Sequence, residues 1–193
     1  MRVRAHRRYF AAGLLAVLVL LVPVAALQSG CGTDNGTLMD EAAPHDVGFS
    51  TIAQGVSSQY GRFDEGTIPG DSPPECIIIT ENEDYQRLQS LASFSEEMPA
   101  VDFGQYIVIA AMQGTKNTGG FAISIMHASQ DETEVRVEVD IVEPEPGSIN
   151  VQMLTSPYHL VKAERSSFDP RGRLNFTFVD QKDISLSQEP AQI

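Results

Sequence analysis

Apolar residues recur along the chain in two patterns, one alternating and one continuous. In residues 133–142, TEVRVEVDIV, apolar residues alternate with charged ones, which predicts a strand with one buried and one solvated face. Residues 105–112, QYIVIAAM, lack alternation and predict a central strand covered on both sides. Turn signals bound further segments rich in β-branched or aromatic residues, which we predict to be strands: 47–56, 76–80, 120–128, 157–164 and 173–180.

One amphipathic helix is predicted to interrupt these seven strands. Thr80 as N-cap and Glu83 three residues later match a capping box, and the first turn is acidic. An apolar stripe at helical spacing is expected to lie on the sheet: Tyr85, Leu88, Leu91 and Ala92. A single helix among mostly antiparallel strands predicts an α+β domain.

The N-terminus has the pattern of an export signal. MRVRAHRRYF carries four arginines and precedes the apolar run AAGLLAVLVLLVPVAAL. With Pro23 inside it, this run is at the short end for a membrane-spanning helix, which needs about 20 residues. We therefore predict a signal peptide over residues 1–30. Arg7, Arg8 and Phe10 match part of a twin-arginine signal, so the export route stays open.

The residues at the end of this segment are similar to a bacterial lipobox. Ser29 and Gly30 precede Cys31, although Leu27 stands one position earlier than the usual aliphatic residue. This pattern predicts a lipoprotein with lipid on Cys31, anchored to a membrane of the cell envelope on its extracytoplasmic face. The alternative is an ordinary cleaved secretory signal.

Only Cys31 and Cys76 are present, so the sequence predicts neither a disulfide framework nor a cysteine zinc site. Cys76 begins the β-branched run CIIIT, which favours a buried thiol.

The chain is strongly acidic, with a formal net charge of −13. Residues 1–30 hold four of its 13 basic residues and none of its 26 acidic ones, so the chain after cleavage is more acidic still. Nucleic acid is therefore excluded as a partner on charge grounds. We predict a flexible tether over residues 31–46, a domain over 47–181 and a disordered tail over 182–193.

The stretch GTKNTGGF, residues 114–121, resembles a phosphate-binding loop only superficially. A Walker loop joins a strand to a helix with Gly-Lys-Ser/Thr in order, whereas here asparagine follows the lysine and strands are predicted on both sides. The glycines are interpreted as turn residues of a hairpin. We expect no cofactor and no metal.

Several motifs together resemble the C-terminal domain of the PrcB family. They are Asp102-Phe103 before the central strand, Thr118-Gly119-Gly120-Phe121, the acidic segment ending at Pro146-Gly147, and the run TSPYH at residues 155–159. The resemblance extends over most of residues 49–180. The founding member of the family belongs to a surface protease complex.

The resemblance implies a non-catalytic binding module that supports assembly or stability of an exported protease complex, or binds another envelope protein. Two turn-rich segments have the composition of a docking surface. The predicted protein-binding residues are Lys116, Asn117, Thr118, Gly119, Gly120 and Phe121, with Thr155, Ser156, Pro157, Tyr158 and His159. The alternative is that Gly120 and Pro157 only shape turns and that both aromatic residues are core.

Two other functions stay open. One is an exported hydrolase that uses Ser156 and His159, although no Gly-x-Ser-x-Gly or His-Glu-x-x-His motif is present. The other is an envelope structural protein with no defined client.

Overall fold

The computed structural model describes residues 43–60, 73–94 and 97–193. The predicted signal peptide, the lipidation site Cys31 and most of the predicted tether lie outside the described residues. Within them, no helix is long and apolar enough to cross a membrane.

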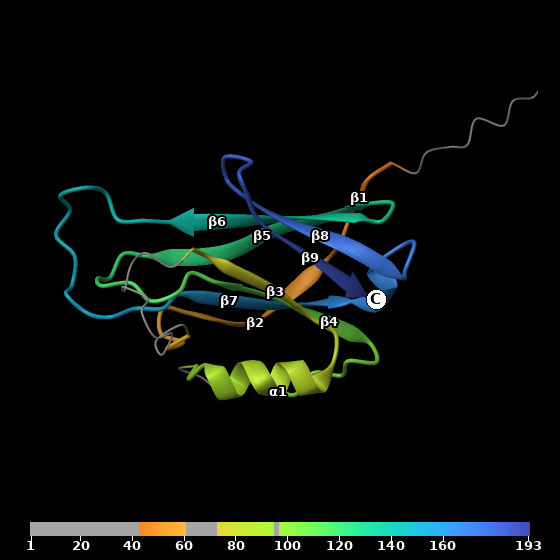
Figure 1. Ribbon diagram of the computed structural model, residues 1–193, viewed down its shortest axis with the longest axis horizontal. Coiled ribbons are helices and arrows are strands. Elements are labelled where there is room, and N and C mark those ends of the chain that lie inside the picture. Colours follow the sequence, from red (N-terminus) through yellow and green to blue (C-terminus); the bar gives the residue numbers. More distant parts are fainter. Residues whose placement is uncertain (1–42, 61–72, 95–96) are drawn as a thin grey trace, which may run out of the picture. The chain divides into compact units, whose positions relative to one another are not determined.

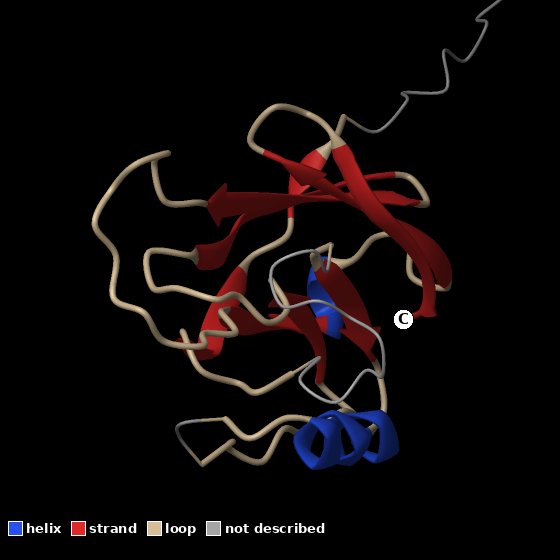
Figure 2. Cartoon of the chain, turned by 60° about the vertical axis from the view of Figure 1, so that its left-hand side comes forward, coloured by secondary structure: helices blue, strands red, loops and turns tan. Residues whose placement is uncertain are grey.

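Two β-sheets face each other, and the helix α1 covers the outer face of the smaller one (Figures 1 and 2). The five-stranded sheet has the order β1-β5-β6-β8-β9 and the four-stranded sheet the order β2-β7-β4-β3. All pairings are antiparallel except the parallel pair β6–β8. The elements are β1 (His45–Asp46), β2 (Phe49–Gly55), β3 (Glu75–Ile79), α1 (Asn82–Leu91), β4 (Tyr106–Met112), β5 (Ala122–Asp131), β6 (Glu134–Val142), β7 (Tyr158–Glu164), η1 (Arg165–Ser167), β8 (Arg173–Asp180) and β9 (Ser185–Gln192). The predicted α+β class is confirmed, and all seven predicted strands form.

The buried apolar side chains form two separate cores, one between the sheets and one under α1. Val135, Val137 and Val139 of β6 are buried between the sheets, as the period-two pattern predicts. Strand β4 contributes to both cores, because Ile107 and Ile109 face the other sheet while their neighbours lie under α1. Burial of one such side chain contributes about 1.5–3 kcal/mol. The central position predicted for this strand is therefore confirmed.

The helix begins one residue later than predicted. Its N-cap is Glu81, whose side chain makes no capping hydrogen bond, so the predicted capping box at Thr80 is wrong. Thr80 instead directly follows β3, and its carbonyl oxygen accepts a hydrogen bond from Nη2 of Arg165 at 2.8 Å. Tyr85 and Leu88 are buried as predicted, whereas Leu91 is 59% exposed.

The predicted disordered tail is wrong, because its residues form the edge strand β9. This strand pairs antiparallel with β8, and Leu186, Ala191 and Ile193 pack partly buried against the core between the sheets. Proline is tolerated at an edge strand, which explains Pro190 in this position. The last two residues of the predicted tether likewise pair with β5 as β1.

Cys76 is buried where β3 approaches β9, which confirms the predicted buried thiol. Only 2% of its surface is exposed. Burial raises the pKa of the Cys76 thiol to about 12, and the nearby Ser187 hydroxyl on β9 opposes this rise. Since the thiolate is the reactive form, the folded protein protects this residue.

His159 connects the two sheets by hydrogen bonds. Its Nδ1 accepts the backbone N–H of Ile125 on β5 at 2.8 Å, which leaves the ring proton on Nε2, 3.0 Å from Oγ1 of Thr51 on β2. Burial lowers the pKa of His159 below its ordinary value of 6.5. The buried ring is therefore neutral, with both nitrogens occupied.

If β9 covers Cys76, removal of this strand will expose the thiol. We expect a chain with Cys31→Ser that ends at Lys182 to react with a thiol reagent at least ten times faster than the full-length Cys31→Ser chain. Leu186→Ser offers a milder disruption of the same strand. Equal reaction rates for all three proteins would show that β9 does not protect Cys76.

We expect the domain to lose stability on acidification partly through His159. Protonation adds a proton to Nδ1, which already accepts the Ile125 N–H. Because the folded pKa lies below that of the unfolded chain, this stabilisation is present above about pH 6.5 and is lost as the pH falls through the folded pKa. Urea unfolding at pH 7, 6 and 5 should show that the free energy of unfolding declines less for His159→Asn than for the wild-type chain. An equal decline of the unfolding free energy in both proteins would contradict this role of His159.

Candidate protein-binding site

Three connections meet at one end of the sheets and form what we call the loop platform: residues 56–60 after β2, residues 113–121 between β4 and β5, and residues 143–157 between β6 and β7. The latter two lie on the left in Figure 1. The N–H of Lys116 donates to the carbonyl oxygen of Thr155 at 2.7 Å, and the N–H of Thr155 donates back at 2.9 Å. The two segments predicted to bind protein therefore lie side by side, which the sequence left open.

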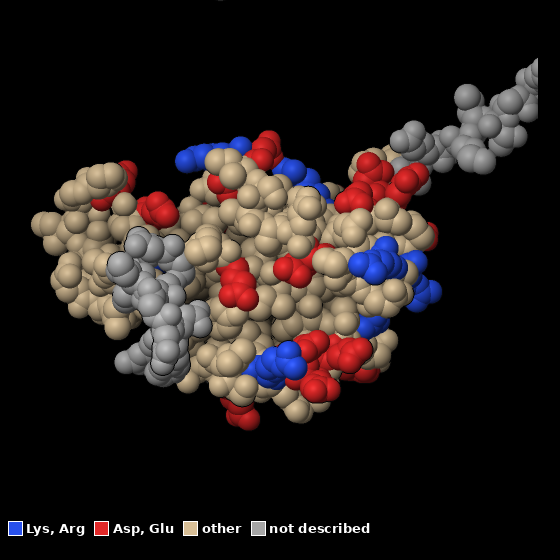
Figure 3. All heavy atoms as spheres, viewed as in Figure 1, with Lys and Arg blue, Asp and Glu red and all other residues tan. Residues whose placement is uncertain are grey.

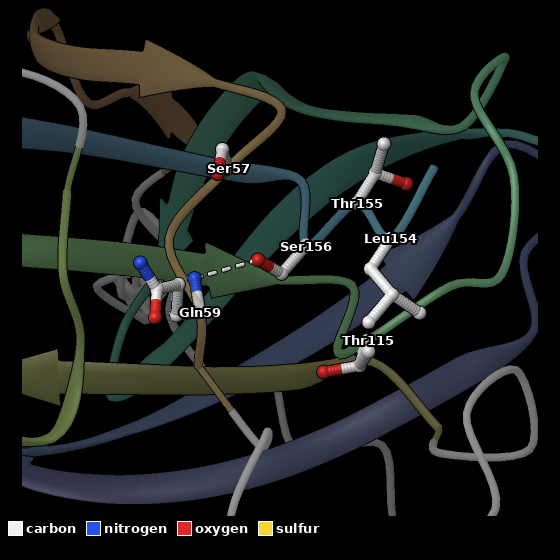
Figure 4. Close-up of a pocket in the computed structure, with 6 residues that line it drawn as sticks. All are labelled: Ser57, Gln59, Thr115, Leu154, Thr155 and Ser156. Atoms are coloured by element: carbon white, nitrogen blue, oxygen red, sulfur yellow. Dashed lines mark hydrogen bonds between the residues drawn. The ribbon is translucent and has the colours of Figure 1, made fainter. Parts of the chain in front are cut away.

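Ser156 joins the first and third connections through its backbone and its hydroxyl. Its Oγ accepts the N–H groups of Ser58 at 3.0 Å and Gln59 at 2.7 Å, the latter drawn in Figure 4. Its carbonyl oxygen accepts the Ser58 hydroxyl at 2.9 Å, and its N–H donates to the carbonyl oxygen of Val56 at 2.9 Å. The Ser58 N–H also donates to the Ser156 carbonyl oxygen at 3.1 Å, so five hydrogen bonds fix the base of the long connection.

The glycine pair of GTKNTGGF permits close contact between the second and third connections. The N–H of Gly119 donates to the carbonyl oxygen of Val151 at 2.9 Å. Gly120 has φ +90°, and a Cβ there would lie 2.8 Å from Oδ1 of Asn150 and 3.1 Å from Cβ of Pro144. Both the backbone conformation and the space therefore require glycine at position 120.

The connection over residues 113–121 is not the predicted hairpin. Strand β4 belongs to the four-stranded sheet and β5 to the five-stranded sheet, so the segment crosses between sheets. Its backbone groups pair with the β6–β7 connection in place of a β4–β5 ladder. The prediction that strands flank this segment on both sides is confirmed.

Most of the eleven predicted protein-binding residues are buried. Tyr158 is fully buried against Phe94, with ring centroids 4.8 Å apart, so its predicted exposure to a partner is wrong. Nζ of Lys116 lies 5.6 Å from the ring centroid of half-buried Phe121. The residues divide into exposed Asn117 and Gly120, half-buried Thr118, Gly119 and Phe121, and buried Lys116, Thr155, Ser156, Pro157, Tyr158 and His159. The TSPYH run therefore forms the base of the platform.

The β6–β7 connection exposes an apolar group that the sequence analysis missed. It consists of Ile149, Val151, Met153 and Leu154, which we call the apolar tip. Ile149 is fully exposed, Val151 is 68% exposed and the other two are about half exposed. The alternation in INVQM, residues 149–153, could have indicated an extended segment.

The exposed charges that stand next to the apolar tip in the described sequence are acidic. Arg136 is the only basic residue between positions 117 and 161, and its guanidinium pairs with Asp183 and Glu138. Glu143 and Glu145 stand at the start of the connection, both exposed and without an ion-pair partner among the described residues. In Figure 3 the left-hand end of the domain is mostly uncharged, with acidic groups along its upper edge.

A small polar pocket of about 140 Å³ opens beside the tip (Figure 4). Leu154 belongs both to the tip and to the pocket wall. The Thr115 hydroxyl donates to the carbonyl oxygen of Tyr60 at 3.2 Å, and the Thr155 hydroxyl donates to that of Thr118 at 2.9 Å. The pocket is lined by Ser57, Gln59, Thr115, Leu154, Thr155 and Ser156. A cavity of about 150 Å³ can hold a group the size of a benzene ring, so one side chain fits here.

The residues of the alternative hydrolase site are bonded to other groups. Ser156 Oγ accepts two backbone N–H groups, and the ring nitrogens of His159 bond Ile125 and Thr51. A serine nucleophile needs its base within hydrogen-bond reach. These contacts give both residues structural roles. No group of His, Cys, Asp or Glu suited to a metal occurs in the part of the chain that the structure describes.

Gly120→Ala tests whether the glycine pair seats the long connection. We expect it to lose more unfolding free energy than Gly147→Ala, whose φ is also positive at +83° but whose Cβ would meet nothing within 4 Å. A strained backbone alone costs roughly 1–3 kcal/mol. Chemical denaturation measures both variants, and equal losses would show that the contact with Asn150 is unimportant.

Comparison with known proteins finds a similarity in the central part of the domain. The model of the PrcB C-terminal domain matches residues 107–164, which run from β4 to the end of β7 and include the second and third connections of the loop platform. Searches of curated proteins and of solved structures returned no match. The match confirms the resemblance to the PrcB C-terminal domain over residues 107–164, the central part of the range predicted from the sequence.

Proposed function

We propose that this chain is a non-catalytic subunit of an exported protease complex and that its loop platform binds the partner. The family match points to a role related to a protease complex. The observation that carries the rest is the apolar tip, which stands exposed on a base fixed by backbone hydrogen bonds.

Exposed apolar side chains are unfavourable in the free protein, and covering them with a partner favours a complex. Four neighbouring apolar side chains on one connection exceed the scattered exposure normal for a soluble surface. Covering one fully would contribute about 1.5–3 kcal/mol, and association costs several kcal/mol in lost motion. A fixed base lowers that cost, because the tip is ordered before the partner arrives.

The pocket beside the tip supports the same role. It has room for one side chain, and Leu154 joins its wall to the apolar surface. Interfaces concentrate binding energy where an anchor enters a pocket surrounded by apolar contacts. In this proposal the TSPYH run contributes by shaping the pocket and holding the tip, since its own side chains are buried.

We also propose that lipid on Cys31 anchors the domain to a membrane of the cell envelope. The 12 residues between Cys31 and Pro44 can span at most roughly 45 Å when fully extended. An anchor of that length would let the platform meet a membrane-associated protease while the acidic domain stays outside the bilayer. Mass spectrometry of the mature protein tests the lipidation.

Polar substitution at the tip should release the partner without unfolding the domain. We expect Ile149→Ser with Val151→Ser to reduce recovery of an exported protease in co-purification from native membranes at least tenfold, since hot-spot truncations each cost about 2 kcal/mol or more. Leu91→Ser with Ile184→Ser is a matched control, because these residues are 59% and 58% exposed elsewhere.

Denaturation should give similar unfolding free energies for both double variants. Loss of protease from the control as well, or retention by the tip variant, would contradict the assigned surface. Failure of the wild-type chain to recover any protease would contradict the proposed function itself.

A further inference from the structure

We propose that the apolar tip is covered by an extended segment of the partner that is apolar and carries lysine or arginine next to its apolar residues. The basic side chains would face Glu143 and Glu145. This inference rests on the proposed function for the existence of a partner and adds the chemistry of its docking segment.

The first support is the position of the two carboxylates. Glu145 begins the turn that leads to Ile149, because its carbonyl oxygen accepts the N–H of Ser148 at 3.0 Å and the Ser148 hydroxyl at 2.7 Å. Asn150 Nδ2 donates to the same hydroxyl at 2.6 Å. This turn keeps Glu145 close to the start of the apolar tip, and Glu143 precedes it by two residues, so one ligand could reach the carboxylates and the tip together.

The second support is that no basic side chain of the described residues forms an ion pair with these carboxylates. The nearest basic residue in sequence on the facing connection is Lys116, which is 5% exposed and lies over Phe121. Arg136 is engaged by two carboxylates of its own. An incoming lysine or arginine would therefore gain attraction that nothing within the described residues already satisfies.

The backbone of the tip supports an extended ligand. Val151 uses its carbonyl oxygen for Gly119 and Met153, whereas the N–H groups of Val151 and Leu154 donate no hydrogen bond among the described residues. Exposed main-chain donors beside apolar side chains suit a partner in extended conformation, whose backbone bonds add affinity and whose side chains add specificity.

Charge argues against two other occupants. In a symmetric contact between two copies, Glu143 and Glu145 of one chain would approach the same residues of the other, and each chain carries a net charge of −13. An anionic membrane surface would repel the same carboxylates. A basic polypeptide has neither penalty.

The test uses three synthetic peptides and the chain from residue 32 onward. One peptide has two lysines followed by alternating valines and serines, the second has glutamates in place of the lysines, and the third has serines in place of the valines. We expect the first to bind at least tenfold more tightly than the other two by fluorescence anisotropy, with amide shifts at Val151 and Leu154. Binding should weaken as salt is raised from 50 to 500 mM.

Charge reversal locates the basic side chains. Glu143→Lys with Glu145→Lys should lose the preference for the lysine peptide and gain affinity for the glutamate peptide. Asp131→Lys with Glu132→Lys makes the same change in net charge at the other end of the β5–β6 pair and should change nothing. Equal effects of both double variants would show general electrostatics and overturn the assignment.

Other outcomes also overturn it. No binding of the lysine peptide, or equal binding of the glutamate peptide, would exclude a basic docking segment. Concentration-dependent dimers lost on Ile149→Ser would identify a second copy as the occupant, and sedimentation with phosphatidylcholine vesicles would identify a membrane. If the Glu143→Lys with Glu145→Lys variant recovers as much protease as the wild-type chain, this inference is refuted and the proposed function stands.

Discussion

The loop platform depends on backbone hydrogen bonds that hold the β6–β7 connection against two other connections. Thr155 and Ser156 lie just before β7, and their backbone groups pair with Lys116 on one side and with Val56 and Ser58 on the other. A connection of this length would otherwise have many conformations, and each ordered residue costs about 1–2 kcal/mol in backbone entropy. Fixing its end next to a central strand restricts the whole segment.

This constraint explains why TSPYH is buried although it looks like a surface turn. Tyr158 and His159 begin β7, which lies between β2 and β4 in the four-stranded sheet. Tyr158 fills the core under α1, and His159 bonds across to β5 in the opposite sheet. The motif thus joins both cores to the platform, and the residues available to a partner lie just upstream of it.

The regular elements could be predicted because each strand buries enough apolar surface to show in its own sequence. Alternation in β6 and the continuous run in β4 indicated their burial correctly. Strand β9 was missed because an edge strand with Pro190 and few apolar residues depends on pairing with β8. The helix start was misplaced because Thr80 directly follows β3, so the cap moves to Glu81.

The site was predicted only in part, because exposure is a property of packing between distant segments. Lys116 and Thr155 were both selected, yet nothing local showed that they pair and become buried. Gly119 and Gly120 were interpreted as hairpin residues, since a close approach by Asn150 leaves no local signal. The apolar tip was missed for the converse reason, because apolar residues in a strand-like pattern usually predict burial.

The combination of an acidic domain and an apolar tip determines how a partner would be selected. Apolar burial supplies affinity but discriminates poorly, since one methylene changes binding by only about 1–3 kcal/mol. Charge supplies discrimination, because like-charged partners are repelled before contact. In the proposed complex, carboxylates that pair with no described cation would therefore favour basic partners for the apolar tip, and their mutual repulsion would oppose contact between two copies of this domain. The same acidic surface would thus keep the tip accessible until the proposed partner arrives.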